Sequence, residues 1–371
     1  MRFTSLQENL KKGLNIVGHI NSKNINLPIL NNILINTKKT IIEFTSTNLE
    51  IGIKHQVRGK VEQDGEFTVD ARLINEYISL LESGKKVEVE LKDEELGIKC
   101  DNYKTKIKGE SAKEYPLIPT ISKESYFSCN LSNFKESLAK VIFAVSNNEN
   151  RTELTGVLFY FLDGKLFLVA TDSYRLAEKE LVVEGVNTKE EEQKVIVPAK
   201  TIQELLRILN NFEEGESEIK IYLSENQILF SFDSVEMISR TINGHYPDYK
   251  QIIPSSSQTE VLVDRDELIR AVKAVALFSK TGINDITLTF TKNKLTISSF
   301  SGASGESQVE LDCNLQGEVN DLTINYRYLL DGLNNINGEM IKIKILNNTT
   351  PCLLKPEDRD DYLYIVMPIK Q

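Results

Sequence analysis

The sequence is poor in the residues from which metal cages, disulfide frameworks and histidine-based active sites are built. Its 371 residues include four cysteines, three histidines and no tryptophan. The cysteines lie far apart and form no Cys-x-x-Cys pair, which argues against a structural zinc site and against a disulfide framework. The sequence therefore predicts no metal and no cofactor, and we expect the cysteines to be reduced, partly buried thiols.

Long apolar runs and an excess of basic charge are also lacking. No hydrophobic stretch is long enough to cross a bilayer, and the first five residues do not begin a signal peptide. A cytoplasmic protein is the default expectation. The formal net charge of −10 argues against a protein that coats nucleic acid through a basic surface, although it leaves room for local basic faces.

The chain does contain a threefold repeat. A short alternating strand followed by helical spacing of apolar residues occurs in FTVDARLINEYISLL, VIVPAKTIQELLRIL and LTINYRYLLDGLNNI, which begin at positions 67, 195 and 322. A second set of strand–turn–helix matches begins at positions 2, 126 and 260, with Ser132 and Asp264 where helix caps are expected. Alternating strands joined by hairpin turns such as Asp163-Gly164 lie between the two helices of a repeat.

The ends of the repeats mark the domain boundaries. Tyr115-Pro116, Tyr246-Pro247 and Met367-Pro368 close the three copies, and connectors that contain proline and serine follow the first two. The predicted domains are therefore 1–122, 123–254 and 255–371. Each is an α+β unit in which two helices pack on antiparallel sheets, and about 120 residues are enough for such a unit to fold alone.

Seven short strings, placed in order along the repeats, carry a resemblance to a known family. They are NLPILNNIL (26–34), LTGVLF (154–159), VATDSYRLA (169–177), VIVPAK (195–200), GHYPDYKQIIP (244–254), NYRYLLDGL (325–333) and YIVMPI (364–369). Any one string alone is a weak signal. Together they show that the chain resembles, over its whole length, the bacterial DNA polymerase III β subunits, the DNA sliding clamps.

The resemblance implies a fold and a set of partners. The expected fold is three tandem clamp-type domains, and a head-to-tail homodimer closes six such domains into a ring around duplex DNA. The expected function is that of a processivity factor with no catalytic activity. Its expected partners are duplex DNA bound without sequence preference, a clamp loader, the polymerase III catalytic subunit, and other polymerases and repair proteins that carry short linear motifs.

Helix charge is consistent with such a ring. The six predicted helices together carry a small positive formal charge, whereas the whole chain carries −10. A mildly positive bore inside an acidic shell suits a ring that holds DNA with few fixed phosphate contacts. Small helix charges also scatter by a few units without any function, so this observation alone leaves both interpretations open.

The segment ATDSYRLA (170–177) could belong to an active site or to a polar turn. Thr171-Asp172 corresponds to Thr47-Asn48 of the first repeat, which predicts a strand-end turn closed by bonds from side chains to the backbone. Tyr174-Arg175-Leu176 has no counterpart there and is the better candidate for function. Because no histidine or GxSxG motif accompanies Ser173, the sequence argues against a catalytic serine.

In the family, this segment forms one wall of a pocket between the second and third domains that binds short linear motifs. An apolar slot that includes methionine suits varied hydrophobic anchors, and Arg175 and Asn325 are expected to orient the peptide backbone. The resemblance places in this pocket Leu154, Thr171, Ser173, Tyr174, Arg175, Leu176, Pro247, Ile252, Ile283, Asn325, Tyr328, Ile365, Val366, Met367, Pro368 and Ile369.

The sequence departs from the family pattern in this pocket. Ser173-Tyr174 stand where Gly-His is common, which adds bulk to the wall, and Gln251 replaces a residue that is often basic. We therefore expect the pocket to persist with a shifted motif preference.

DNA and subunit contacts are predicted with less support. The resemblance assigns DNA contacts to Lys23, Asn24, Asn148 and Arg151. Placement on the predicted helices adds Lys12, Lys140, Lys200, Arg207, Arg270 and Lys273, although a lysine on a helix is often only part of a solvated face. The subunit interface is expected to pack Ile107 against Leu277 and Phe278, with Thr105 where a larger aromatic residue is often found.

Two other functions remain compatible with the residues alone. An α+β enzyme would need a base, metal ligands or a phosphate-binding loop that the sequence does not supply. A monomeric scaffold of three domains that binds peptides without DNA differs from a clamp only in its assembly.

Overall fold

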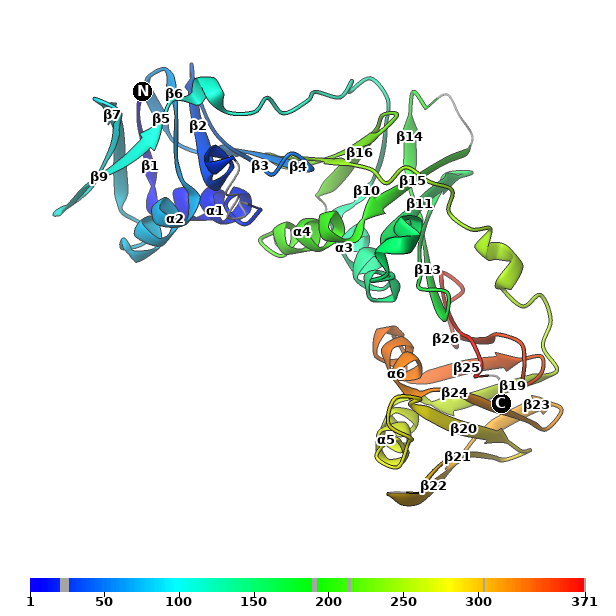
Figure 1. Cartoon of the computed structure of the whole chain (residues 1–371). Coiled ribbons are helices and arrows are strands. Elements are labelled where there is room, and N and C mark those ends of the chain that lie inside the picture. The colour runs from blue at the N-terminus through cyan, green and yellow to red at the C-terminus, as the bar shows by residue number, and fades with distance from the viewer. Residues whose placement is uncertain (21–26, 189–191, 213–214, 216, 303, 370–371) are drawn as a thin grey trace. The chain divides into compact units, whose positions relative to one another are not determined.

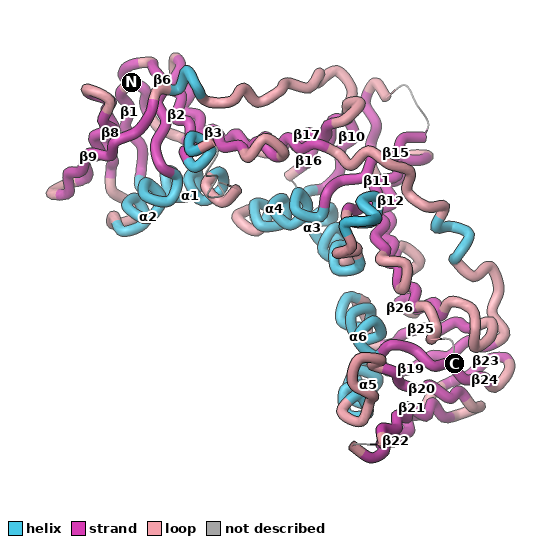
Figure 2. The backbone as a smooth tube through the Cα atoms, viewed as in Figure 1, coloured by secondary structure: helices cyan, strands magenta, loops and turns pink. Residues whose placement is uncertain are grey.

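The computed structural model describes residues 1–20, 27–188, 192–212, 215, 217–302 and 304–369. Strands and helices alternate along the chain (Figure 2), and all strand pairings among these residues are antiparallel. By contacts between Cα atoms the chain divides into two compact units. Unit one is Met1–Lys135, Val183–Lys189 and Lys200–Thr241; unit two is Glu136–Val182, Glu190–Ala199 and Ile242–Gln371. The middle predicted repeat thus contributes to both units.

The order of elements repeats three times. The first copy comprises β1 (Arg2–Leu6), α1 (Gln7–Val17), β2 (Asn32–Lys38), β3 (Ile41–Thr47), β4 (Ile51–Val57), β5 (Lys60–Gln63), β6 (Gly65–Asp70), α2 (Ala71–Leu80), β7 (Lys86–Lys92), β8 (Glu95–Cys100) and β9 (Tyr103–Glu110). The second comprises β10 (Tyr126–Asn130), α3 (Leu131–Ala139), β11 (Gly156–Leu162), β12 (Lys165–Thr171), β13 (Arg175–Val182), β14 (Glu184–Val186), β15 (Glu192–Pro198), α4 (Ala199–Leu209), β16 (Glu218–Leu223), β17 (Gln227–Phe232) and β18 (Val235–Arg240). The third comprises β19 (Thr259–Asp264), α5 (Arg265–Ala276), β20 (Asp285–Phe290), β21 (Lys294–Ser301), β22 (Gly305–Asp312), β23 (Asn314–Gly317), β24 (Asn320–Asn325), α6 (Tyr326–Asn335), β25 (Met340–Ile345), β26 (Cys352–Pro356) and β27 (Tyr362–Val366). The predicted order of strand, helix, strands, helix and strands is confirmed.

Capping side chains begin several of the helices, whereas α1 begins after Leu6 without one. The Asp264 carboxylate accepts a hydrogen bond from the Glu267 amide at 2.7 Å, which confirms the predicted cap of α5. The predicted cap at Ser132 is wrong. Helix α3 begins at Leu131, so the residue just before it is Asn130. The Asn130 side chain accepts from the Asn133 amide at 3.0 Å, which is one of the free amides of the first helical turn.

Unit one contains a continuous sheet in which strands of two repeats pair. Its fourteen strands run in the order β14-β10-β16-β17-β18-β4-β3-β2-β6-β9-β8-β7-β1-β5. Strands β4 and β18 join the repeats, with His55 opposite Val235. Helices α1 and α2 lie side by side in this unit (Figure 1), and α1 packs on β3 and β4. None of the described helices is long and apolar enough to span a membrane.

His55 is a buried residue of β4, and burial lowers the pKa of its imidazole to about 4. Its Nδ1 lies 3.2 Å from the Ser234 hydroxyl. A hydrogen bond with the Ser234 backbone favours the charged form and opposes the drop in pKa, whereas the nearby charge of Lys12 adds to it. The imidazole is therefore neutral in the folded protein at neutral pH.

Acidification is expected to destabilise unit one through His55. An unfolded histidine titrates near pH 6.5 and this folded one near 4, so between those values the unfolded chain binds the proton more tightly. The contribution of neutral His55 to the free energy of unfolding is present above about pH 6.5 and is lost as the pH falls, by about 2.5 kcal/mol at about pH 4.5. Urea unfolding of the wild type and of His55→Gln between about pH 4.5 and pH 6.5 measures this loss of stability. The difference between the two stabilities should shrink on acidification, and a difference independent of pH would contradict the assignment.

Unit two contains two sheets. Nine strands run in the order β15-β11-β12-β13-β27-β26-β25-β19-β23, and four run in the order β22-β21-β20-β24. Strands β13 and β27 join the second and third repeats, with Leu176 opposite Ile365. Helices α5 and α6 lie side by side (Figure 1). In α6, a Cβ on Gly332 would lie 2.2 Å from the Tyr364 ring, so glycine allows α6 to approach β27 closely.

Candidate functional site

The turn between β12 and β13 forms as the repeat predicted. Thr171 Oγ1 donates to the Arg175 carbonyl at 2.6 Å, and Asp172 Oδ1 accepts from the amides of Tyr174 and Arg175 at 2.9 and 3.0 Å. In the first repeat, Thr47 donates to the Ile51 carbonyl, and Asn48 Oδ1 accepts from the Glu50 and Ile51 amides at 3.1 and 2.8 Å. The prediction of a turn closed by side chains is confirmed in both copies.

The turn also determines the environment of Ser173. Its φ of 79° matches the 75° of Leu49 at the same place in the first repeat, so the left-handed conformation belongs to the turn. The Ser173 Oγ accepts a hydrogen bond from Arg151 Nη1 at 2.7 Å. A guanidinium has no lone pair with which to take the hydroxyl proton, so this contact does not activate a nucleophile.

Arg175 is held inside the protein. Its Nε donates to Asp172 at 3.0 Å, its Nη2 donates to the Phe143 carbonyl at 3.0 Å, and its Nη1 donates to Asp331 of α6. The guanidinium carbon also lies 4.8 Å from the centroid of the Tyr328 ring. Since its nitrogens are bonded to these groups and its side chain is only 12% exposed, Arg175 positions the wall of the site and ties β13 to α6.

Two tyrosines form the exposed part of this wall. The rings of Tyr174 and Tyr328 are stacked, with centroids 6.2 Å apart and an interplanar angle of 17°. Tyr174 is 63% exposed, and burial raises the pKa of the half-buried Tyr328 hydroxyl. Asn325 also has a local role, because its Oδ1 caps α6 by accepting from the Arg327 amide at 2.9 Å.

The end of the chain lies beside the tyrosines. The Met367 amide donates to the Tyr174 carbonyl and the Ile369 amide donates to the Thr323 carbonyl, both at 2.8 Å. Pro368 forms an isolated bridge with Ile324. The tail is therefore attached on one side to the β12–β13 turn and on the other to β24, and the half-buried side chains of Met367, Pro368 and Ile369 remain partly open to solvent.

The predicted pocket residues divide into three sets by exposure. Six are half-buried: Arg175, Asn325, Tyr328, Met367, Pro368 and Ile369. Ser173, Tyr174, Pro247, Ile252 and Ile283 are exposed. Five others are buried and can only support the surface from behind: Leu154, Thr171, Leu176, Ile365 and Val366. Leu176 and Ile365 pack in one cluster with Tyr249, and the half-buried Tyr246 packs against that cluster and donates to the Val169 carbonyl at 3.3 Å.

The predicted DNA contacts are not equivalent. Lys200, Arg270 and Lys273 are exposed, and within the described residues no acidic group pairs with them. Arg207 instead donates to the Asn15 and Ile16 carbonyls at the end of α1 and pairs with Glu204. Such an arginine complements the negative end of a helix dipole, which is a structural role.

The remaining predicted DNA contacts have internal partners or lie outside the described residues. Lys140 donates to Asn337 at 2.6 Å, and burial lowers the pKa of its ammonium group. Asn148 accepts from the Asn150 amide, and Arg151 pairs with Glu153 at 3.2 Å. Lys12 lies 4.3 Å above the Phe212 ring. Lys23 and Asn24 fall outside the described residues.

The residues predicted for subunit contact differ in what they offer a partner. Ile107 is only 3% exposed and packs within its own sheet, where it lies opposite Leu96. Leu277, which follows α5, is 77% exposed, and Phe278 is half-buried. Of the three, Leu277 presents the most apolar surface.

The four cysteines are all reduced and stay apart. Cys352 is fully buried, and burial raises the pKa of its thiol to about 12, as it does for Cys129. Among the described residues, no group of three or more histidine, cysteine or acidic side chains could hold a metal ion.

Comparison with known proteins shows the family of the chain. Models of the N-terminal, central and C-terminal domains of the DNA polymerase III beta subunit match residues 1–119, 129–248 and 250–370. The chain belongs to the DNA polymerase III β subunit family. As a member of that family it is a non-catalytic processivity subunit built of three clamp domains.

Relatives in the family match the chain from end to end. The beta sliding clamps of Staphylococcus aureus and Staphylococcus epidermidis are 29% and 28% identical to it over 381 residues, which cover 100% of this chain and 99% of each relative. The crystal structure of the β subunit from Pseudomonas aeruginosa superposes with a TM-score of 0.94 at 27% identity and full coverage of both chains. The Bacillus subtilis sliding clamp gives 0.93 at 26% identity, with 100% and 99% coverage.

Sequence reasoning missed several residues on which the site depends. Asp331 and Phe143 hold Arg175, and Thr323 holds the tail, but none was singled out. Asp331 lies in α6, two residues before Leu333 of the string NYRYLLDGL, so its place on the helix was visible. Its partner is 156 residues away, and no local pattern reveals that pairing.

Proposed function

We propose that the chain forms a head-to-tail homodimer whose six domains close a ring around duplex DNA. The domains of each subunit are 1–122, 123–254 and 255–371. The observation that carries the proposal is the threefold order of strands and helices, matched in order by three domain models of one clamp family. Heterologous contacts between repeated domains close into a ring when their rotation permits it.

DNA is held in this proposal by topology. The exposed Lys200, Arg270 and Lys273 supply weak, sequence-independent attraction to phosphates, and few fixed contacts allow the ring to slide. The exposed Leu277, together with Phe278, supplies apolar surface to the subunit interface. A clamp loader opens that interface and a cytoplasmic replication machinery uses the ring.

The surface formed by Tyr174, Tyr328 and residues 367–369 is the proposed docking site for partner proteins. Short linear motifs of the polymerase III catalytic subunit, other polymerases and repair proteins insert apolar side chains here. Half-buried methionine, proline and isoleucine next to a stacked tyrosine pair offer an apolar surface of the required chemistry. A Pseudomonas aeruginosa clamp of the same fold has been crystallised bound to griselimycin, which supports a ligand-binding role for the family fold.

Topological binding is tested by cutting the DNA. Protein loaded onto a nicked circular plasmid by a clamp loader should stay bound during gel filtration and should leave once the plasmid is made linear. Blocking both ends of the linear DNA with a tightly bound protein should restore retention, which controls for damage during cutting. Retention on free linear DNA, or a strictly monomeric mass at micromolar concentration, would contradict the ring and favour a monomeric peptide-binding scaffold.

A further inference from the structure

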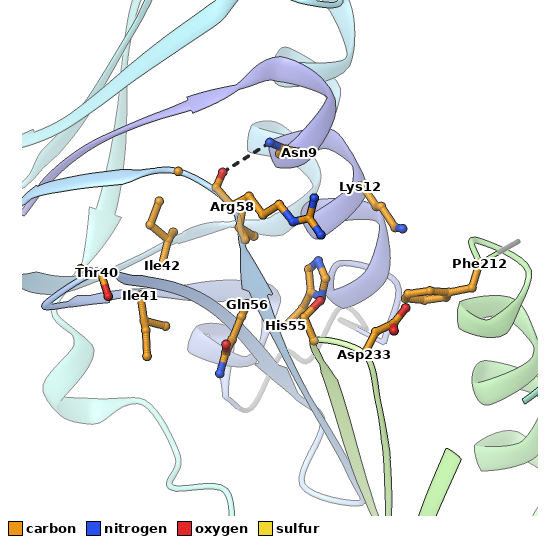
Figure 3. Close-up of a pocket in the computed structure, with 13 residues that line it drawn as sticks. Asn9, Lys12, Thr40, Ile41, Ile42, His55, Gln56, Arg58, Phe212 and Asp233 are labelled. Atoms are coloured by element: carbon orange, nitrogen blue, oxygen red, sulfur yellow. Dashed lines mark hydrogen bonds between the residues drawn. The ribbon is translucent and has the colours of Figure 1, made fainter. Parts of the chain in front are cut away.

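A second pocket lies within unit one, where the first and second repeats meet. It has a volume of about 690 Å³, and we call it the corner pocket. Its walls include Lys12, Ile41, His55, Arg58, Phe212 and Asp233 (Figure 3). This volume lies within the range of pockets that hold small ligands or a few side chains of a peptide. The pocket is separate from the surface formed by Tyr174 and Tyr328, which belongs to unit two.

The corner pocket holds two cations, Lys12 and Arg58, and one carboxylate, Asp233, so its lining keeps a net positive charge. Among the described residues, no acidic oxygen lies within ion-pair distance of Lys12 or Arg58, and both residues are exposed. Lys12 rests on the Phe212 ring at 4.3 Å, and the Arg58 guanidinium reaches into the same space near His55 (Figure 3). The chain as a whole carries −10, so a concave site whose lining is net positive is a local exception.

Apart from Asp233, the rest of the lining is apolar or neutral. Ile42 and Val57 are buried behind the pocket, and Ile41 is a large hydrophobic residue that is 46% exposed. The imidazole of His55 is uncharged at neutral pH because burial lowers its pKa to about 4. A ligand that fits this lining combines negative charge with an aliphatic group.

The corresponding corner in unit two is closed. Lys179 occupies the position of His55, since it lies opposite Tyr362 in β13–β27 as His55 lies opposite Val235 in β4–β18. Glu136 occupies the position of Lys12, ten residues after the first residue of the preceding strand.

Internal bonds fill that second corner. Lys179 pairs with Asp361, and Asn337 accepts from Lys140 and donates to Glu136 at 2.6 and 2.9 Å. The space left there is about 20 Å³. The repeated architecture can therefore close this corner with its own charges. In the part of unit one that the structure describes, by contrast, no acidic group pairs with Lys12 or Arg58.

We propose that the corner pocket binds a short acidic peptide segment of a partner protein. One or two carboxylates of the segment contact Lys12 and Arg58, and an adjacent aliphatic side chain packs on Ile41 and Val57. Charge complementarity and the apolar floor select this chemistry. A nucleotide fits less well, because Lys12 covers a face of the Phe212 ring on which a base would stack, and Asp233 repels a phosphate dianion more strongly than a carboxylate.

The test observes the pocket directly in the full-length protein. The protein is isotope-labelled at isoleucine δ1 methyls and titrated with the peptide acetyl-Asp-Glu-Leu-Ile-Glu-amide. The Ile41 and Ile42 methyl signals should shift and saturate at millimolar peptide. The Ile369 signal reports separately on the proposed docking site in unit two. Shifts confined to Ile369 would overturn the corner pocket while leaving the proposed function intact.

Charge-matched variants separate the pocket from general attraction. Lys12→Ser combined with Arg58→Ser should weaken binding at Ile41 by about tenfold, because two ion pairs at the rim are lost. Lys11→Ser combined with Lys60→Ser removes the same charge from exposed positions outside the pocket and should leave binding unchanged. Equal weakening in both double variants contradicts the proposal, as does saturation of the Ile41 and Ile42 shifts by deoxyadenosine monophosphate at a lower concentration than the peptide.

Discussion

Replacing Arg175 with methionine is expected to lower the free energy of unfolding by about 3 kcal/mol, because its charge is bonded inside the protein. The Arg175 side chain is 12% exposed and the paired Asp172 is 14% exposed. Without the guanidinium, the Asp172 carboxylate and the Phe143 carbonyl would stay largely buried and lose a donor. Methionine replaces much of the lost volume, so the measured loss reports on charge and hydrogen bonding.

Asp331 provides the matched control for this prediction. It accepts from the same guanidinium, but its side chain is 47% exposed, so water can replace the arginine. Asp331→Asn should therefore cost less than about 1 kcal/mol. Urea unfolding of both variants measures the two losses. Equal losses in the two variants would mean that Arg175 acts as an ordinary surface ion pair. Arg175→Lys should lie in between, since lysine keeps the charge but cannot bond three groups in fixed directions.

The local features of the fold were readable from the sequence. The Thr-Asp and Thr-Asn turns were predicted because side-chain bonds within four residues determine them, and both formed. The hairpin at Asp163-Gly164 also formed, with φ of 51° and 72°, as such a two-residue turn requires. The cap at Ser132 failed because two polar residues, Asn130 and Ser132, stand near the same helix start. A shift of two residues decides which of them meets a free amide.

Pairing between repeats was not readable in the same way. Strands β4 and β18 are separated by more than a hundred residues and form one sheet, so compact units cross the boundaries of the repeats. A periodic pattern identifies a strand but not its neighbour, since any strand edge offers the same backbone groups. The division of the middle repeat between two units follows from these pairings.

The roles of individual site residues depended on such long-range contacts. Arg175 was expected to orient a peptide, yet Asp172, Asp331 and the Phe143 carbonyl bond its nitrogens. Arg207 was expected to face DNA, and it instead bonds the carbonyls at the end of α1. Both residues are charged side chains whose direction is set by partners far away in the sequence. Composition and spacing locate such residues but do not give their partners.

Deleting the last five residues should weaken binding of a polymerase-derived peptide more than a hundredfold, a loss of about 3 kcal/mol. The deletion removes Met367, Pro368 and Ile369, whose side chains form the partly open apolar surface beside Tyr174. It leaves β27 (Tyr362–Val366) intact, including its pairing with β13. Fluorescence anisotropy with a labelled peptide from the polymerase III catalytic subunit measures the affinity, and analytical ultracentrifugation measures the dimer.

The position of the tail explains why a short deletion has so large an effect. The amides of Met367 and Ile369 bond the carbonyls of Tyr174 and Thr323, so these residues are preorganised before a peptide arrives. Removing only Lys370 and Gln371 spares both bonds and should leave the affinity unchanged. The dimer should persist in both deletions, because neither removes Leu277 or Phe278, the apolar residues proposed for the subunit interface. Undiminished binding after the five-residue deletion would place the peptide elsewhere, since the deletion removes the Met367 and Ile369 side chains from this surface.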